Sequence, residues 1–246
     1  MRVTILLFAT LKDIAGGNQL SLTLPGDTAT LADVRQTLTD QYPQMQENLK
    51  VALAAINQEY AFAGDSVHEG DDIAFFPPVS GGEASDDPAH PEIIQLADAP
   101  LDHDALIAAI TTPATGAVCL FSGMVRGMTH KEGHLPQTDY LEYEAYAPMA
   151  LAKMRQVAAE IRSQWGLVQG IAIVQRIGKL SVGQNTVLIA CSAGHRDDGC
   201  FEAARYGIDR LKEIVPVWKK EIGRDGTAWI EGAYHPTPED RATGQT

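Results

Sequence analysis

The sequence has few cysteines, no long apolar run and a deficit of positive charge. Only three of its 246 residues are cysteines, a sparse, odd set that gives no disulfide framework and suits a reduced cytoplasm. No CxxC or HExxH motif occurs, so we expect no metal site and thiols that pack as small hydrophobes. No apolar run is long enough to cross a bilayer. Asp13 and the lack of a small-residue cleavage site argue against a signal peptide at the N-terminus.

The acidic balance argues against nucleic acid and anionic membranes as partners. The chain has 19 Lys and Arg against 32 Asp and Glu, for a formal net charge of −13. Such a chain repels polyanions unless its basic residues cluster. Because 15 of the 19 cations follow residue 82, their arrangement in that part of the chain is informative.

The first 82 residues predict a small α+β domain. Alternating or aliphatic segments predict strands over 2–9, 19–24, 51–56 and 71–76. Apolar residues at helical spacing predict a helix over 30–41, which Pro43 stops. This order predicts a helix packed on one face of a sheet. The segment closes with Pro77-Pro78-Val79-Ser80-Gly81-Gly82.

A second, larger α+β domain is expected over residues 92–246. The acidic, proline-bearing stretch 83–91 has no apolar periodicity and is the best linker in the chain. After it, helices are expected over 102–110, 148–165 and 201–215, and strands over 116–125, 139–146, 167–177, 186–191 and 227–230.

Gly81-Gly82 allows two interpretations. A glycine pair at a domain edge is usually a flexible joint, and the residues alone favour that role. The pair also follows a compact domain through a Pro-Pro stretch that holds the chain extended. A tail without side chains could thread a narrow channel and place a terminal carboxyl at a distant reactive centre.

Cations in the second half form the other candidate site. They are Arg126, His195-Arg196, Lys212 and Lys219-Lys220, the last followed by Glu221. If they converge, they form a pocket for an anionic, phosphorylated ligand, because Arg donates in pairs and Lys supplies point charge.

Each of these residues also fits an ordinary role. Arg205, Asp209 and Lys212 could be surface helix pairs. The Lys219–Glu221 segment could be a charged, solvated edge strand. His195 could satisfy a loop backbone group.

Two parts of the chain resemble the two subunits of one enzyme family. Residues 1–82 resemble the ubiquitin-like β-grasp sulfur carriers, above all the small subunit of molybdopterin synthase, through the closing motif FFPPVSGG. Residues from about 93 to 234 resemble the large subunit, through FSGMVRG, LEYEAYAPMA, QRIGKLSVG, SAGHRD and IDRLKEIVPVWKKE. The resemblance therefore implies a β-grasp domain fused to a large-subunit α+β domain.

The resemblance also implies site residues. Substrate contacts fall on Met124, Val125, Arg126, His195, Arg196, Lys212, Lys219, Lys220 and Glu221, and the catalytic residues are Lys212, Lys219 and Gly82. Gly82 would carry the sulfur as a thiocarboxylate after adenylation. The DDGC segment after Arg196 is one residue longer than the family pattern, so Asp197 or Asp198 could partly neutralise Arg196.

The implied reaction is sulfur transfer to cyclic pyranopterin monophosphate (precursor Z), which gives the molybdopterin dithiolene without a metal or other cofactor. The implied partners are an adenylating activating enzyme, a sulfur donor and a second copy in a homodimer. Because Glu83 follows Gly82, the Gly82 carboxyl is an amide, and we expect cleavage after it. The alternatives are a non-catalytic ubiquitin-like scaffold and a sulfur carrier for another thiolation pathway, such as that of thiamine or tRNA.

Overall fold

The computed structural model describes residues 1–26, 28–76, 90–129, 136–224 and 226–230, together with Thr237 and Asp240. The chain divides into two compact units. Unit 1 is Met1–Val79 with Glu231–Thr246, and unit 2 is Ser80–Ile230. The split lies close to the predicted boundary at residue 82, although the predicted second domain ran to residue 246. Residues 83–89 of the predicted linker lie outside the described residues.

Unit 1 has a five-stranded sheet with three short helices. The spatial order of the sheet is β2-β1-β7-β4-β5, with β1 and β7 parallel and the other neighbours antiparallel. Its strands are β1 (Arg2–Leu7), β2 (Gln19–Thr23), β4 (Leu53–Ile56), β5 (Glu59–Ala61) and β7 (Asp72–Phe76). A small second sheet pairs β3 (Ala29–Thr30) with β6 (Ser66–Val67). The helices are α1 (Thr10–Ala15), α2 (Leu31–Gln41), the 3-10 turn η1 (Pro43–Met45) and α3 (Gln46–Val51).

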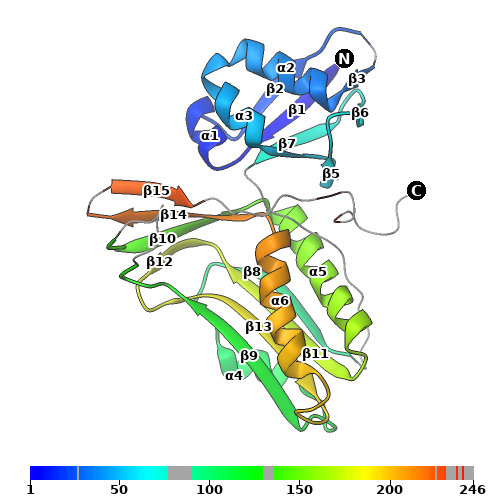
Figure 1. Cartoon of the computed structure of the whole chain (residues 1–246), viewed down its shortest axis with the longest axis vertical. Coiled ribbons are helices and arrows are strands. Elements are labelled where there is room, and N and C mark those ends of the chain that lie inside the picture. Colours follow the sequence, from blue (N-terminus) through cyan, green and yellow to red (C-terminus); the bar gives the residue numbers. More distant parts are fainter. Residues whose placement is uncertain are drawn as a thin grey trace. The chain divides into compact units, whose positions relative to one another are not determined.

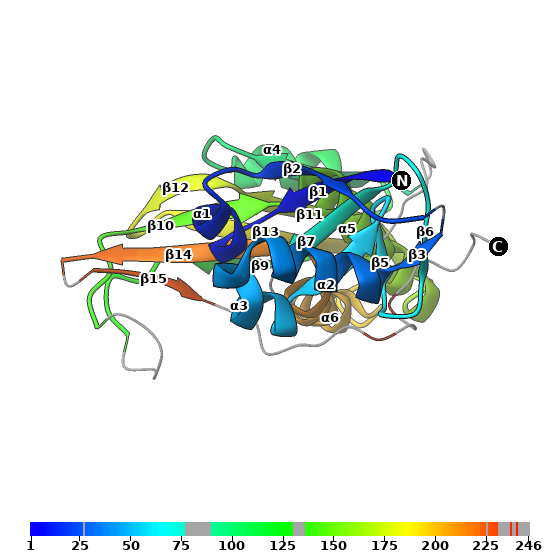
Figure 2. The same cartoon turned by 90° about the horizontal axis from the view of Figure 1, so that it is seen from above.

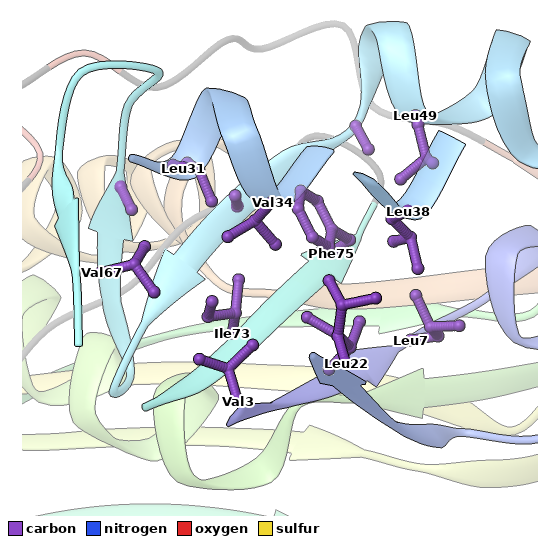
Figure 3. Packing of buried hydrophobic residues seen from close by; sticks show 14 of the residues in the cluster. Val3, Leu7, Leu22, Leu31, Val34, Leu38, Leu49, Val67, Ile73 and Phe75 are labelled. Atoms are coloured by element: carbon purple, nitrogen blue, oxygen red, sulfur yellow. The ribbon is translucent and has the colours of Figure 1, made fainter. Parts of the chain in front are cut away.

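One buried cluster holds the helices of unit 1 to its sheet. Leu31, Val34 and Leu38 line the inner side of α2 and pack on strand residues such as Val3 and Phe75 (Figure 3). The predicted α+β domain with a helix on one sheet face is thus confirmed. The predicted strand over 51–56 starts two residues too early, because Val51 is the last residue of α3.

Unit 2 has two four-stranded sheets and three helices. The first sheet has the order β8-β11-β13-β9 and the second β12-β10-β14-β15. The strands of the first are β8 (Glu92–Ala97), β11 (Val168–Arg176), β13 (Asn185–Ala193) and β9 (Ala117–Met124). Those of the second are β12 (Gly178–Ser181), β10 (Tyr140–Ala145), β14 (Val217–Gly223) and β15 (Gly226–Ile230). The helices are α4 (His103–Ala109), α5 (Ala147–Gln164) and α6 (Cys200–Ile214).

The two faces of the first sheet are covered differently. The long helices α5 and α6 lie side by side against one face (Figure 1). On the other face, a cluster of Ala172, Val174, Leu188 and Ala190 packs with Leu106 of the short helix α4. In the second sheet, β14 and β15 run as a pair in both views (Figure 1, Figure 2). Unit 2 is therefore the predicted larger α+β domain.

The pairing of β9 with β13 sets where the loops of unit 2 lie. The strands are antiparallel, with Ala117 opposite Ala193 and Met124 opposite Asn185. Seven residue steps at about 3.3 Å each separate the two ends of this ladder by roughly 23 Å. Helix α6 begins just after β13 and returns along the sheet to the start of β14 (Figure 1).

A polar network joins α5 to α6. Arg210 of α6 donates from Nε and Nη2 to the Glu160 carboxylate of α5 at 2.9 and 3.2 Å. Tyr206 Oη and Gln156 Nε2 donate to the same carboxylate at 2.7 and 2.6 Å. Burial by itself would raise the pKa of Glu160, but these hydrogen bonds and the Arg210 charge together hold that pKa below its ordinary value of 4.5. The network therefore attaches the middle of α6 to α5.

Replacing Glu160 by Gln should destabilise the fold by roughly 1–3 kcal/mol at pH 7. The change removes the closer of the two carboxylates paired with Arg210 and leaves Glu213, at 3.3 Å. A carboxylate with a depressed folded-state pKa contributes stability above its unfolded pKa and loses it as pH falls through the folded value. The difference in unfolding free energy between wild type and Glu160→Gln, measured by urea denaturation, should therefore be largest at pH 7 and shrink below pH 4.5. Glu202→Gln, at an exposed position on α6, is the control. A gap that does not change with pH would contradict this role.

Candidate active site

The segment Met124–Arg126 leaves β9 at the end of the ladder where β13 begins. Met124 is 52% exposed, Val125 is buried and Arg126 is exposed. The Val125 N–H donates to Gln184 O at 2.8 Å, which fixes the backbone next to Arg126. Val125 packs with Leu141 and Leu180 in a small buried cluster. This cluster attaches the Arg126 segment to the second sheet.

Lys219, Lys220 and Glu221 lie in β14, which pairs with β10 on one side and β15 on the other. The interpretation of this segment as a solvated edge strand is therefore wrong: the strand is interior, and Glu221 is only 5% exposed. Successive strand residues point to opposite faces. Lys219 and Glu221 share the face of their cross-strand partners Tyr143 and Leu141. Lys220 points to the other face, where its Nζ lies 5.2 Å from the centre of the Trp229 ring.

Tyr143 sits directly opposite Lys219 and was not among the predicted site residues. Its pKa is raised, mainly by burial and to a smaller extent by Glu221, while a hydrogen bond with the Thr186 side chain opposes the rise. The phenol is thus neutral near pH 7. Since Thr186 belongs to β13 and Tyr143 to β10, this contact also joins the two sheets.

Lys212 lies in the last turn of α6 and is exposed. Its helix ends at Ile214, and β14 starts at Val217. The C-terminal end of α6, which carries Lys212, and the start of β14, which carries Lys219, are joined by two residues. Both lie at the end of unit 2 at which β9 stops and β13 starts (Figure 1). On the same helix, Arg205 pairs with Asp209 at 3.7 Å, with both side chains largely exposed, so the ordinary surface role holds for that pair.

His195 and Arg196 lie in the loop between β13 and α6, and both are exposed. The Asp198 carboxylate accepts from the His195 backbone N–H at 2.7 Å, and the Asp198 N–H donates to His195 O at 3.1 Å. Asp197 pairs with Arg196 at 3.3 Å. Of the two acids that could partly neutralise Arg196, Asp197 forms an exposed ion pair with it, and Asp198 binds the loop backbone instead.

The predicted site residues fall at two opposite ends of unit 2. Arg126, Lys212 and Lys219 lie at one end, and His195-Arg196 follow Ala193 at the other end of the β9–β13 ladder. A convergence of all these cations within one copy of the chain is therefore not observed. Gly82, the predicted sulfur-bearing residue, lies outside the described residues.

The three cysteines are free thiols, with Cys191 and Cys200 buried and Cys119 half-buried. Cys119 and Cys191 are direct cross-strand partners. Burial raises the pKa of each thiol, that of Cys191 to about 12. They stay protonated near neutral pH and serve as packing groups. Among the described residues, no group of three or more His, Cys, Asp or Glu side chains could hold a metal ion. No helix in the described ranges is long and apolar enough to span a membrane.

Two family models match separate parts of the chain. The model described as ThiS family matches residues 5–82, and the model described as MoaE protein matches residues 96–214. Among curated relatives, the molybdopterin synthase catalytic subunit of Staphylococcus carnosus (strain TM300) is 46% identical over 132 residues, covering 52% of this chain and 83% of the relative. The same subunit of Bacillus subtilis (strain 168) is 40% identical over 139 residues, covering 56% and 85%.

Solved structures are also similar to separate parts of the chain. Molybdopterin synthase from Staphylococcus aureus has 40% identity and a TM-score of 0.49, covering 59% of this chain and 98% of that chain. The modifier protein SAMP1 from Haloferax volcanii has 30% identity and a TM-score of 0.30, covering 33% and 100%.

Replacing Asp198 by Ala should loosen the His195 loop, because the His195 N–H loses its acceptor. The expected cost is about 0.5–2 kcal/mol, with faster hydrogen exchange at the His195 amide by mass spectrometry. Asp197→Ala, which removes only an exposed ion pair, should change stability by less than about 0.5 kcal/mol. Equal exchange rates in the two variants would show that Asp198 does not hold this loop.

Proposed function

The chain belongs to the molybdopterin synthase catalytic subunit family, and on that premise we propose that it transfers sulfur from a glycine thiocarboxylate to cyclic pyranopterin monophosphate. It is an enzyme of molybdenum cofactor biosynthesis. It carries a sulfur-carrier-type domain in the same polypeptide, so the predicted fusion is confirmed. Family membership argues against the scaffold and other-pathway alternatives.

The charge distribution supports distinct roles for the cations. Lys212 and Lys219 flank the thiocarboxylate tail, stabilise the negative charge that develops as the cyclic phosphate opens and sulfur attacks, and handle protons. The substrate phosphate and pterin are held by Arg126, His195 and Arg196 through charge-assisted hydrogen bonds. Each tail brings one sulfur, so the dithiolene needs two visits.

One observation supports an active site shared between two copies of the chain. The candidate residues are divided between the two ends of unit 2. One substrate molecule cannot reach across a ladder of roughly 23 Å to contact both sets in one copy. In a two-fold dimer that brings His195 and Arg196 of one copy beside Lys212 and Lys219 of the other, this contact occurs twice, as every isologous contact does. We propose that the active site is built from two copies and that each dimer holds two such sites.

Mixing two inactive variants tests this arrangement. Lys219→Ala and His195→Ala should each lose nearly all conversion of cyclic pyranopterin monophosphate by a supplied thiocarboxylated carrier. After subunit exchange at equal amounts, half of the dimers are mixed and each has one intact site, so activity should return to about one quarter of wild type.

The control mixes Lys219→Ala with Lys212→Ala, which damage the same half-site and should not restore activity. A mixture of Lys219→Ala and His195→Ala that stays inactive after proven subunit exchange would contradict a site shared between copies. Full activity of Lys219→Ala alone would contradict the sulfur-transfer role itself.

The peptide bond between Gly82 and Glu83 requires a cleavage step. A carboxyl in an amide cannot be adenylated, so the carrier becomes competent only after hydrolysis gives a free Gly82 carboxylate. The acidic stretch that follows has the composition of a proteolysis site. We propose that a protease cuts there, that an activating enzyme adenylates Gly82, and that a sulfur donor converts it to the thiocarboxylate. The three free thiols fit a cytoplasmic location.

Mass spectrometry of the protein from its native cell should find a fragment that ends at Gly82. The Gly82-terminated, thiocarboxylated fragment should support turnover, and full-length chain with Glu83→Pro, designed to block cutting, should not. An active preparation that contains only intact chain would refute the cleavage step.

A further inference from the structure

An arginine is buried on the α4 side of the first sheet in unit 2. Arg176 is the last residue of β11 and is only 3% exposed. The preceding stretch of β11 on this face is apolar, with Ala172 and Val174 in the cluster under α4. Burying a cation costs free energy unless an opposite charge or full hydrogen bonding compensates it. The surroundings of Arg176 therefore require an explanation.

No carboxylate forms an ion pair with Arg176 in the described ranges. Its Nη1 donates to the backbone O and the Oδ1 of Asn185, both at 3.3 Å. Its Nε is buried and has no hydrogen-bond partner in the structure as described. The contacts of the Arg176 guanidinium are therefore with neutral oxygens, each at 3.3 Å. Its Nε donor remains without an acceptor.

The polar side chains next to Asn185 belong to His103 and Ser122. Asn185 Nδ2 lies 3.3 Å from His103 Nε2, and Ser122 Oγ lies 3.4 Å from the same nitrogen. The three come from β13, α4 and β9, so three elements converge beside the arginine. His103 and Ser122 are half-buried, which leaves this polar cluster reachable from solvent.

We propose that Arg176, Asn185, His103 and Ser122 form an oxyanion-binding site that takes a phosphate group. A bound oxyanion would supply the missing negative charge and accept from the unpartnered Arg176 Nε, and the Ser122 hydroxyl would be a further donor. The site is separate from the lysine pair, since it lies on the α4 face of the sheet whereas Lys212 lies on α6, which covers the opposite face. It adjoins Met124, whose Sδ lies 3.9 Å from Ser122 Oγ.

Two sources could supply this phosphate group. One is free inorganic phosphate. The other is the phosphate of the pterin substrate, because Met124 is a predicted substrate contact, and in that case Arg126, His195 and Arg196 would hold only the pterin. The site itself does not depend on the sulfur-transfer proposal, and its binding test needs no turnover.

The variant Asn185→Asp tests the site with an almost isosteric change. It places a carboxylate where Oδ1 already accepts from Arg176, so it supplies the missing charge from within the chain. In phosphate-free buffer we expect the Tm to rise relative to wild type. In calorimetric titration with inorganic phosphate, the full-length variant should lose at least about tenfold in affinity at one site per chain.

Asn48→Asp, in α3 of unit 1, adds the same charge away from the site and should keep wild-type phosphate affinity. Lys212→Ala should also keep the Arg176-dependent binding. Arg176→Met should lose phosphate binding without a rise in Tm. Phosphate affinity and Tm that are the same in Asn185→Asp and Asn48→Asp would overturn the proposal. Weakened dimerisation of Asn185→Asp with unchanged phosphate binding would overturn it too, because Arg176 would then pair with a carboxylate of a second copy.

Turnover measurements show which of the two phosphate sources occupies the site. A raised KM for cyclic pyranopterin monophosphate in Asn185→Asp, together with lost phosphate binding, identifies the substrate phosphate as the occupant. An unchanged KM with lost phosphate binding identifies free phosphate. Both results support the site, and a wild type without conversion activity would refute the sulfur-transfer proposal while leaving the binding result intact.

Discussion

The antiparallel register of β9 and β13 is the constraint on which the rest of unit 2 depends. With Ala117 opposite Ala193 and Met124 opposite Asn185, the loop after each strand must leave at the opposite end. A shift of the register by one residue would turn every side chain to the other face, so the buried cluster under α4 fixes the pairing. The length of this ladder sets the distance between the loop after β9 and the loop after β13.

The helices and the second sheet hold the candidate residues in two separate groups. Helix α6 starts at the His195 loop and ends near Lys212, and its network with Glu160 holds it along α5. The Val125 cluster and the Tyr143–Thr186 contact bind the second sheet to the first. Arg126, Lys212 and Lys219 are therefore held on rigid elements at one end, which favours a preorganised arrangement of positive charge. A second copy is the simplest source of the remaining residues.

Local patterns in the sequence predict most of the regular elements. The apolar stripes of α5 and α6 give helices at 148–165 and 201–215, within two residues of the structure. The start of α2 follows from a capping box between Thr30 and Asp33. The strand β8 is missed because its pairing with β11 is parallel and distant in sequence. The interior place of β14 also depends on distant partners, which no short window contains.

The arrangement of the candidate site also depends on residues that are distant in the sequence. Motifs identify Arg126, His195 and the lysines one by one, but only the strand register shows that they lie at two ends. Arg176 lies in the QRIGKLSVG motif, and a charged residue at the end of an apolar strand is itself a signal. Tyr143 is recognisable only as the cross-strand partner of Lys219.

The central claim is that one active site combines the two ends of unit 2 from two copies of the chain. The most direct measurement is a crystal structure of the dimer with cyclic pyranopterin monophosphate bound. The account predicts that the substrate contacts His195 and Arg196 of one copy and Lys212 or Lys219 of the other. A substrate held only by residues of a single copy would contradict it.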